Sequence, residues 1–273
     1  MRLKQDVPRK HPAFFSQLKF NAMPKQTGIV RLEGLVDDFS YYKSKDGSYR
    51  LRRKGGVSAE RIAKDPAFRK LRATTSDFTK AANAGKLLRD SIGPLLKQAT
   101  DTRMVSRLTK EMFKVLQADQ TNESGMRKVI DGEAELLRGF EFNANATLST
   151  VFGAVYTPSI DRVSGVLKVD FGSFIPDNAF VTPENCTHYA IKIGGVAIDF
   201  ENRLYITDRK ASDQRKIEDE SPAFELVCQL PAGSPHPLFL LVGVEFFSKE
   251  KVANAKLHKE HSNPLAIVLV SGM

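Results

Sequence analysis

Several features are missing from this 273-residue sequence, and each absence removes a class of protein. There is no Trp, and only two cysteines, Cys186 and Cys228, so the chain is not a disulfide scaffold. The longest apolar stretches, such as 238–244, fall far short of the roughly 20 residues that span a bilayer. The basic N-terminus has neither a continuous apolar core nor a small-residue cleavage site. We therefore expect a cytoplasmic protein without a membrane span, with export by a signal-less route left open.

Recognisable catalytic and cofactor motifs are also missing. We find no P-loop, no Gly-x-Ser-x-Gly elbow and no His-Glu-x-x-His sequence. His258 and His261 are three residues apart, but their Lys-rich surroundings repel a cation. Asp199 and Glu201 share one face of an expected strand, where protection of a sheet edge is the simpler interpretation. The sequence thus predicts no enzyme and no catalytic, cofactor or metal residues, and an unrecognised hydrolase is the most distant alternative.

Charge is distributed unevenly along the chain. Residues 1–138 contain 29 basic and 16 acidic side chains, a net charge of +13, whereas residues 139–273 contain 12 and 16, a net charge of −4. This asymmetry indicates two modules with different partners. Its functional interpretation is attraction to a polyanion, and the alternative is a soluble surface that happens to be rich in lysine.

The first 54 residues combine a basic tail with a β-hairpin. Prolines interrupt residues 1–27, and Met23 is an alternative natural start of the chain. Residues 28–54 have β character, and two aromatic segments, 39–43 and 49–53, flank Asp46-Gly47. An Asp-Gly pair between β-prone segments predicts a hairpin, because glycine accepts the positive φ of a tight turn.

Residues 57–138 are expected to be mainly helical. Apolar residues recur every three or four positions over 68–95 and again over 104–116, and a further segment, 126–137, ends at Gly139. The second helix carries a basic stripe on its polar side, formed by Arg103, Arg107, Lys110 and Lys114. The stripe indicates either a polyanion or acidic-partner site, or a solvated face paired with neighbouring carboxylates.

The apolar period changes to two at residue 140, where residues 140–148 predict a half-buried strand. Prolines separate the further predicted strands, which are 165–171, 187–193, 197–200, 204–208, 224–230, 238–247 and 266–271. The charged stretch 208–221 is expected to be an exposed loop. The sequence thus predicts an α+β fold, with a β-hairpin and helical domain over 28–138 and an all-β, Ig-like antiparallel sandwich over 139–273.

The candidate binding residues come from the hairpin and the basic stripe. In the hairpin, Tyr41 and Tyr49 alternate with Arg50, Arg52 and Arg53, a pattern that suits single-stranded nucleic acid. The alternative interpretation is a cross-strand Tyr41–Tyr49 pair with the cations simply facing outward.

Six segments resemble a family of uncharacterised proteins widespread in Bacteroidota. They are FSYYKSKDG, RKGGVSAERIAKDPAFRKLR, DTRMVSRLTKEMFKVLQAD, IDGEAELLRGFEFN, PLFLLVGVEFF and NPLAIVLV. The resemblance covers about residues 24–273 and leaves 1–22 outside, which favours Met23 as the start. The family has no activity that would assign site residues, and its layout favours a non-enzymatic role.

Together these patterns predict a non-catalytic binding or assembly protein. The expected partner is another protein or a second copy of the chain, since Phe-rich strands and an open sheet edge favour self-association. A nucleic-acid-binding protein that uses the basic hairpin and the stripe is the alternative.

Overall fold

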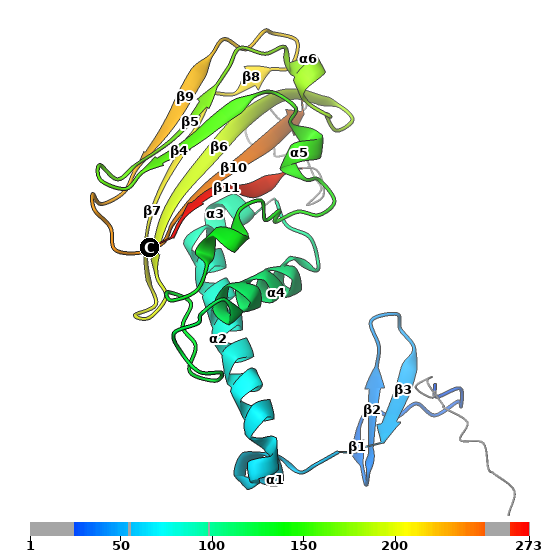
Figure 1. Ribbon diagram of the computed structural model, residues 1–273. Coiled ribbons are helices and arrows are strands. Elements are labelled where there is room, and N and C mark those ends of the chain that lie inside the picture. The colour runs from blue at the N-terminus through cyan, green and yellow to red at the C-terminus, as the bar shows by residue number, and fades with distance from the viewer. Residues whose placement is uncertain (1–24, 54–55, 98, 249–262, 273) are drawn as a thin grey trace, which may run out of the picture. The chain divides into compact units, whose positions relative to one another are not determined.

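The computed structural model describes residues 25–53, 56–97, 99–248 and 263–272. It divides into two compact units, Met1–Lys64 and Asp65–Met273, which we call the basic unit and the body (Figure 1). The predicted domain border at Gly139 is therefore not where the contacts divide. Each unit is described by itself below.

The basic unit contains an antiparallel sheet of three short strands in the order β1-β2-β3. The strands are β1 (Gly34–Val36), β2 (Phe39–Lys43) and β3 (Tyr49–Arg53), and a helix, α1 (Ala59–Lys64), follows them. The predicted Asp-Gly hairpin between β2 and β3 is confirmed. Gly47 takes a φ of +79°, and the Asp46 carboxylate accepts hydrogen bonds from both the amide and the hydroxyl of Ser48. Gly47 thus supplies the positive φ of the turn, and the short Asp46 side chain supplies a hydrogen-bond acceptor at the preceding position.

Most of the expected N-terminal tail, residues 1–24, lies outside the described residues. The last part of it belongs to the sheet, which corrects the boundary at residue 27. Lys25 forms a β-bridge with Arg50, and the Gln26 amide donates to the carbonyl of Tyr49. The Gln26 side chain also bonds the backbone of Leu32 and Arg50, so it ties this edge to the loop before β1.

The body contains two antiparallel sheets that pack face to face (Figure 1). The larger sheet has the order β11-β10-β6-β7, with β8 also paired to β6, and the smaller one has the order β4-β5-β9. The strands are β4 (Tyr156–Asp161), β5 (Val166–Phe171), β6 (Cys186–Asp199), β7 (Leu204–Ala211), β8 (Arg215–Lys216), β9 (Phe224–Gln229), β10 (Leu238–Ser248) and β11 (Leu265–Ser271). The predicted α+β class with a sandwich-like β region is confirmed.

Two long helices precede the sheets, as predicted. The helical elements are η1 (Pro66–Phe68), α2 (Arg69–Ser91), α3 (Gly93–Leu96), α4 (Met104–Gln117), η2 (Ala134–Leu137), α5 (Leu148–Val151) and α6 (Pro176–Ala179). The Asp65 side chain accepts a hydrogen bond from the Ala67 amide and caps η1. Helix α2 stops at Ser91, and Pro94 lies in the first turn of α3, where the missing N–H of proline is not needed.

The helices and the larger sheet share one hydrophobic core, which explains why the chain does not divide at Gly139. Leu88 of α2 and Leu108 of α4 are fully buried in the same cluster as Phe239 of β10. The other face of the larger sheet packs on the smaller sheet, where Leu240 belongs to the second cluster. Strand β10 is therefore covered on both faces, and its continuous apolar sequence reflects this position rather than a half-exposed strand.

Two predicted elements are corrected. Residues 126–137 form turns and only the short η2, and residues 140–148 do not form a strand. The amides of Gly139 and Phe142 instead donate to carbonyls of β11. Phe140 and Phe142 are both buried, with ring centroids 5.0 Å apart, so their spacing reflects packing of an irregular segment rather than a pleat.

The strands also differ in extent from the prediction. Segments 187–193 and 197–200 are one strand, β6, because Gly194 and Gly195 leave room for Leu95 on one face and Leu167 on the other. Strand β4 was not predicted because it contains Pro158, which an edge strand tolerates. Stretch 208–221 includes the end of β7 and all of β8, so it is not simply a loop.

Candidate binding surface on the basic sheet

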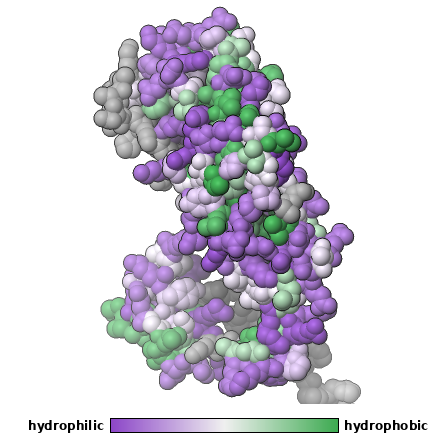
Figure 2. Space-filling model, turned by 90° about the vertical axis from the view of Figure 1, so that its left-hand side faces the viewer, coloured by the Kyte–Doolittle hydropathy of each residue, from purple (hydrophilic) through white to green (hydrophobic). Residues whose placement is uncertain are grey.

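The basic unit differs from the body in having no buried residue among its described positions, 25–53 and 56–64. Several large hydrophobic side chains are open to solvent there, including Ile29 at 104% exposure, Leu35 at 70% and Phe39 at 37%. Across the part of the surface seen in Figure 2, hydrophobic residues emerge as separate patches between hydrophilic ones. Three-stranded sheets normally gain their stability by packing an apolar face, so an uncovered one indicates a surface for a partner.

The strand register sorts the side chains of this sheet onto two faces. Phe39, Tyr41 and Lys43 of β2 pair with Arg53, Leu51 and Tyr49 of β3, and Val36 of β1 pairs with Phe39. Because paired residues share a face, these seven residues form one surface, which we call the aromatic face. Leu35, Ser40, Tyr42, Arg50 and Arg52 form the opposite surface, which we call the arginine face.

The aromatic face places rings and cations next to one another. The ring centroids of Phe39 and Tyr41 are 6.5 Å apart. The Tyr49 ring has two cations over it, the Arg31 guanidinium at 5.0 Å and the Lys43 ammonium at 5.6 Å from the ring centroid. The quadrupole of the ring attracts a cation above its face, so these contacts hold Arg31 and Lys43 beside Tyr49.

The two predicted tyrosines, Tyr41 and Tyr49, share this face but are not directly opposite each other. Tyr41 pairs with Leu51, and Tyr49 pairs with Lys43. The predicted cross-strand Tyr–Tyr pair is therefore corrected to a diagonal arrangement. Phe39 and Arg31 were not among the binding residues predicted from the sequence. Phe39 could have been found from the period of two along β2, which places it on the same face as Tyr41. Arg31 lies in a loop, where no local pattern indicates the position of a side chain.

The arginines of the hairpin are divided between the two faces. Arg50, on the arginine face, forms an ion pair of 2.8 Å with Asp46 and donates from Nε to the Ser48 hydroxyl. Hydrogen bonds from the Ser48 side chain and amide lower the pKa of Asp46, which keeps this partner ionised. Arg52 lies on the same face and is exposed, and Arg53 lies on the aromatic face.

The net positive charge of the protein resides in the basic unit. Residues 1–64 contain 15 basic and 6 acidic side chains, a net charge of +9, which equals the net charge of the whole chain. Residues 65–273 contain 26 of each and are neutral overall. The electrostatic attraction expected from the sequence is thus concentrated on this unit.

The basic stripe of α4 is only partly available for a ligand. Arg107 pairs with Asp101, donates to the carbonyl of Glu141 at 2.7 Å and has its guanidinium 5.2 Å from the centroid of the Phe140 ring. It therefore fastens the segment after Gly139 to α4.

The other three residues of the stripe are exposed. Lys114 forms an ion pair of 2.7 Å with Glu111, whereas Arg103 and Lys110 point to solvent at the N-terminal end and the middle of α4. Arg107, Lys110 and Arg138 line a recess of about 400 Å³, which also contains Glu111 and Glu141. The two carboxylates offset much of the charge of the three cations, so the recess is a weaker polyanion site than the basic sheet.

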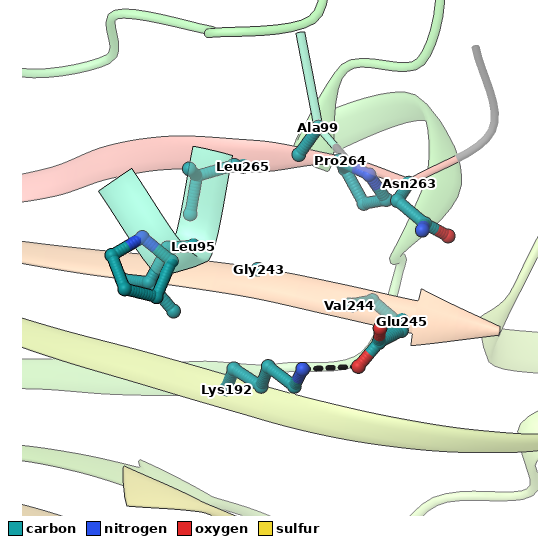
Figure 3. Close-up of a pocket in the computed structure, with 10 residues that line it drawn as sticks. Leu95, Ala99, Lys192, Gly243, Val244, Glu245, Asn263, Pro264 and Leu265 are labelled. Carbon is teal, nitrogen blue, oxygen red and sulfur yellow. Dashed lines mark ion pairs between the residues drawn. The ribbon is translucent and has the colours of Figure 1, made fainter. Parts of the chain in front are cut away.

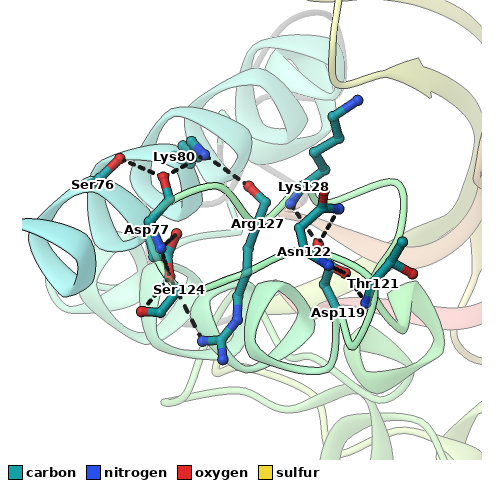
Figure 4. Close-up of polar contacts among 10 residues, drawn as sticks. Ser76, Asp77, Lys80, Asp119, Thr121, Asn122, Ser124, Arg127 and Lys128 are labelled. Carbon is teal, nitrogen blue, oxygen red and sulfur yellow. Dashed lines mark hydrogen bonds and ion pairs between the residues drawn. The ribbon is translucent and has the colours of Figure 1, made fainter. Parts of the chain in front are cut away.

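Two further polar clusters lie inside the body and act as structural ties. In Figure 3, Lys192 and Glu245 form an ion pair across neighbouring strands, next to a crevice of about 30 Å³. Such a volume holds about one water molecule. In Figure 4, Asp77 and Asp119 accept hydrogen bonds from the segment 119–128 and hold it against α2 and α4.

The described ranges hold no group of three or more His, Cys, Asp or Glu side chains suited to a metal ion. His258 and His261 lie outside those ranges. Burial raises the pKa of the Cys228 thiol to about 11, and it also raises the pKa of Cys186. Neither thiol is thus poised as a thiolate at neutral pH.

Comparisons with known proteins add no further assignment. No family model, no curated protein and no solved structure matches this chain. None of the helices within the described ranges combines the length and the apolar character needed to cross a membrane.

Proposed function

We propose that this chain is a non-catalytic binding protein. The body serves as a rigid scaffold, and the sheet of the basic unit is the surface that a partner covers. The observation that carries this proposal is that none of the described residues of the basic unit is buried, although the unit contains Phe39, Leu35 and Leu51.

The energetics of the sheet support this proposal. Ordering a residue costs about 1–2 kcal/mol of backbone entropy, and burial of apolar surface normally offsets that cost. Leu35, Val36 and Phe39 remain 37–70% exposed in the sheet, so little of this surface contributes to the stability of the unit alone. A partner on the aromatic face would bury Val36 and Phe39, whereas Leu35 lies on the opposite, arginine face. Binding and full ordering of the sheet are therefore coupled.

Hydrogen–deuterium exchange on the full chain tests this proposal. In isolation, amides of 34–53 are expected to exchange much faster than those of β6 and β10, which are buried. After addition of an extract from cells that produce the protein, the amides of 34–53 should gain protection while the body is unchanged. Protection that appears only on the body, or a sheet as protected as β10 in the isolated chain, would contradict the proposal.

Light scattering over a range of concentrations identifies the case in which the partner is a second copy. A mass that rises with concentration and returns to that of one chain when Phe39→Ser is introduced would place the self-contact on the sheet. A mass that rises equally in the Phe39→Ser variant would place it elsewhere.

A further inference from the structure

The aromatic face combines two kinds of recognition chemistry on one uncovered sheet. Flat rings on which bases can stack lie beside cations that attract phosphate. Proteins use this combination to bind single-stranded nucleic acid. We propose, as an inference that rests on the function proposed above, that the partner of the aromatic face is single-stranded nucleic acid. Bases stack on Phe39 and Tyr41, and phosphates contact Arg31, Lys43 and Arg53.

The spacing of the rings favours a single strand over a duplex. The centroids of Phe39 and Tyr41 are 6.5 Å apart, with their planes at 54° to each other. Successive bases in a duplex are about 3.4 Å apart along each strand and nearly parallel, so they cannot occupy both rings. A single strand can unstack its bases and turn each one to a separate ring.

The cations lie beside these rings, where the sugar-phosphate backbone of a bound strand would run. Arg53 is opposite Phe39 in the register, and Lys43 follows Tyr41 on the same face of β2. The Tyr49 ring contacts both Arg31 and Lys43, so its role is to position these two cations rather than to stack a base. This arrangement places positive charge beside the rings of Phe39 and Tyr41, which have no cation over them in the contacts described above.

The distribution of charge distinguishes this ligand from a typical protein partner. Residues 25–53 contain seven basic and four acidic side chains and the body is neutral overall, so a polyanion is attracted to the basic unit rather than to the body. A second copy of the chain would bring a like charge to the contact if the two sheets met. An acidic protein surface is the competing occupant, and the test below separates it from nucleic acid.

Fluorescence anisotropy with the full chain and labelled oligo(dT) or oligo(U) of about 12 nucleotides provides this test. We expect binding at low salt that weakens as salt rises. Replacing both rings in Phe39→Leu/Tyr41→Leu keeps apolar side chains but removes the stacking surfaces, and it should weaken binding by about 10-fold or more. Tyr41→Phe keeps the ring and should retain most of the binding that the leucine pair loses.

Variants that leave the rings intact give an independent readout. Lys43→Gln and Arg53→Gln should each reduce the slope of log K against log salt by about 0.7, the value for one phosphate contact on a single strand. The matched control is Arg103→Gln/Lys110→Gln on α4, which removes two exposed cations from the body and should change neither affinity nor slope.

Three outcomes would overturn the inference: no binding at low salt, equal binding by the leucine pair and the native chain, or loss of binding in the α4 control alone. If the oligonucleotides fail but amides of 34–53 gain protection from a nuclease-treated extract, the partner is a protein. The inference then falls while the proposed binding function stands. If no extract protects the sheet either, both fall.

Discussion

At the scale of single residues, buried carboxylates determine the course of the segment between α4 and η2. Asp119 accepts hydrogen bonds from the amides of Thr121, Asn122 and Lys128, and Asp77 accepts one from the Gly125 amide (Figure 4). Burial raises the pKa of Asp119, but these hydrogen bonds outweigh it and hold the pKa at about 2. The carboxylate thus replaces the backbone partners that a helix would have supplied.

Asp119→Ala should lower the free energy of unfolding by about 2 kcal/mol, because three amide donors lose their acceptor. The folded-state pKa lies below the ordinary value of 3.8, so this contribution is complete above about pH 4 and is lost as the pH falls toward 2. Urea unfolding of both proteins at several pH values measures the difference, which should shrink in acid. The control is Asp213→Ala, at an exposed position. An equal loss in both variants would contradict this role of Asp119.

Glycine is needed at position 165 both for its positive φ and because a Cβ has no room there, whereas Gly233 shares only the positive φ. Gly165 has a φ of +74°, and a Cβ there would overlap the carbonyl of Leu230. Gly233 has a φ of +62° with open space around it. We expect Gly233→Ala to cost about 1 kcal/mol from backbone strain alone, and Gly165→Ala clearly more. Thermal unfolding of the two variants measures this, and equal melting temperatures would show that the overlap is relieved without cost.

At the scale of elements, the edge strand β7 is protected over only part of its length. Asp208 in its middle accepts a hydrogen bond from the Gln229 amide of β9. Leu204, Tyr205 and Ile206 at its start are 64%, 44% and 53% exposed. An apolar edge of this kind promotes association between chains, because its backbone groups can pair with another strand.

Ile206→Lys should therefore reduce aggregation at high concentration and leave the melting temperature nearly unchanged. Light scattering during concentration measures the first effect, and calorimetry measures the second. The matched control is Leu136→Lys, since Leu136 is also exposed, at 51%, but lies in the short helix η2 and not in a strand. Equal improvement in both variants would mean that added charge, and not the edge, controls solubility.

Elements with a strong local signal could be predicted from the sequence, and those set by distant contacts could not. Helix α4 and the Asp46-Gly47 hairpin depend on neighbouring residues, and both were found. The segment 126–137 has a helical pattern, but the Asp119 carboxylate accepts a hydrogen bond from its Lys128 amide, and Asp77 accepts one from the Gly125 amide just before it. Arg107 fits the helical period of the basic stripe. Its hydrogen-bond partner is the carbonyl of Glu141, 34 residues away, which no local pattern indicates.

The same limit applies to the candidate surface. The two tyrosines and the arginines of the hairpin were predicted as a group, because aromatic and basic residues alternate there. Their division between two faces needs the strand register, and the contact of Arg31 with Tyr49 needs the course of a loop. Which elements remain uncovered is a property of the folded chain, so exposure of the sheet could not be predicted.

At the scale of the whole molecule, charge and stability are separated between the two units. A chain that starts at Asp65 retains both core clusters and loses the entire net charge of +9. We expect it to melt within a few degrees of the full chain, but to elute from a cation exchanger at much lower salt. A large fall in the melting temperature would show that the basic unit contributes to the stability of the body.

The position of β10 has a consequence for attempts to divide this protein. Helices cover one side of this strand and the smaller sheet covers the other, so each layer supplies half of its surroundings. A break of the chain at residue 139 would separate the helices from the larger sheet and expose the apolar face of each. The two fragments would have to associate to rebuild this shared core, so the three-layered body is a single unit of folding.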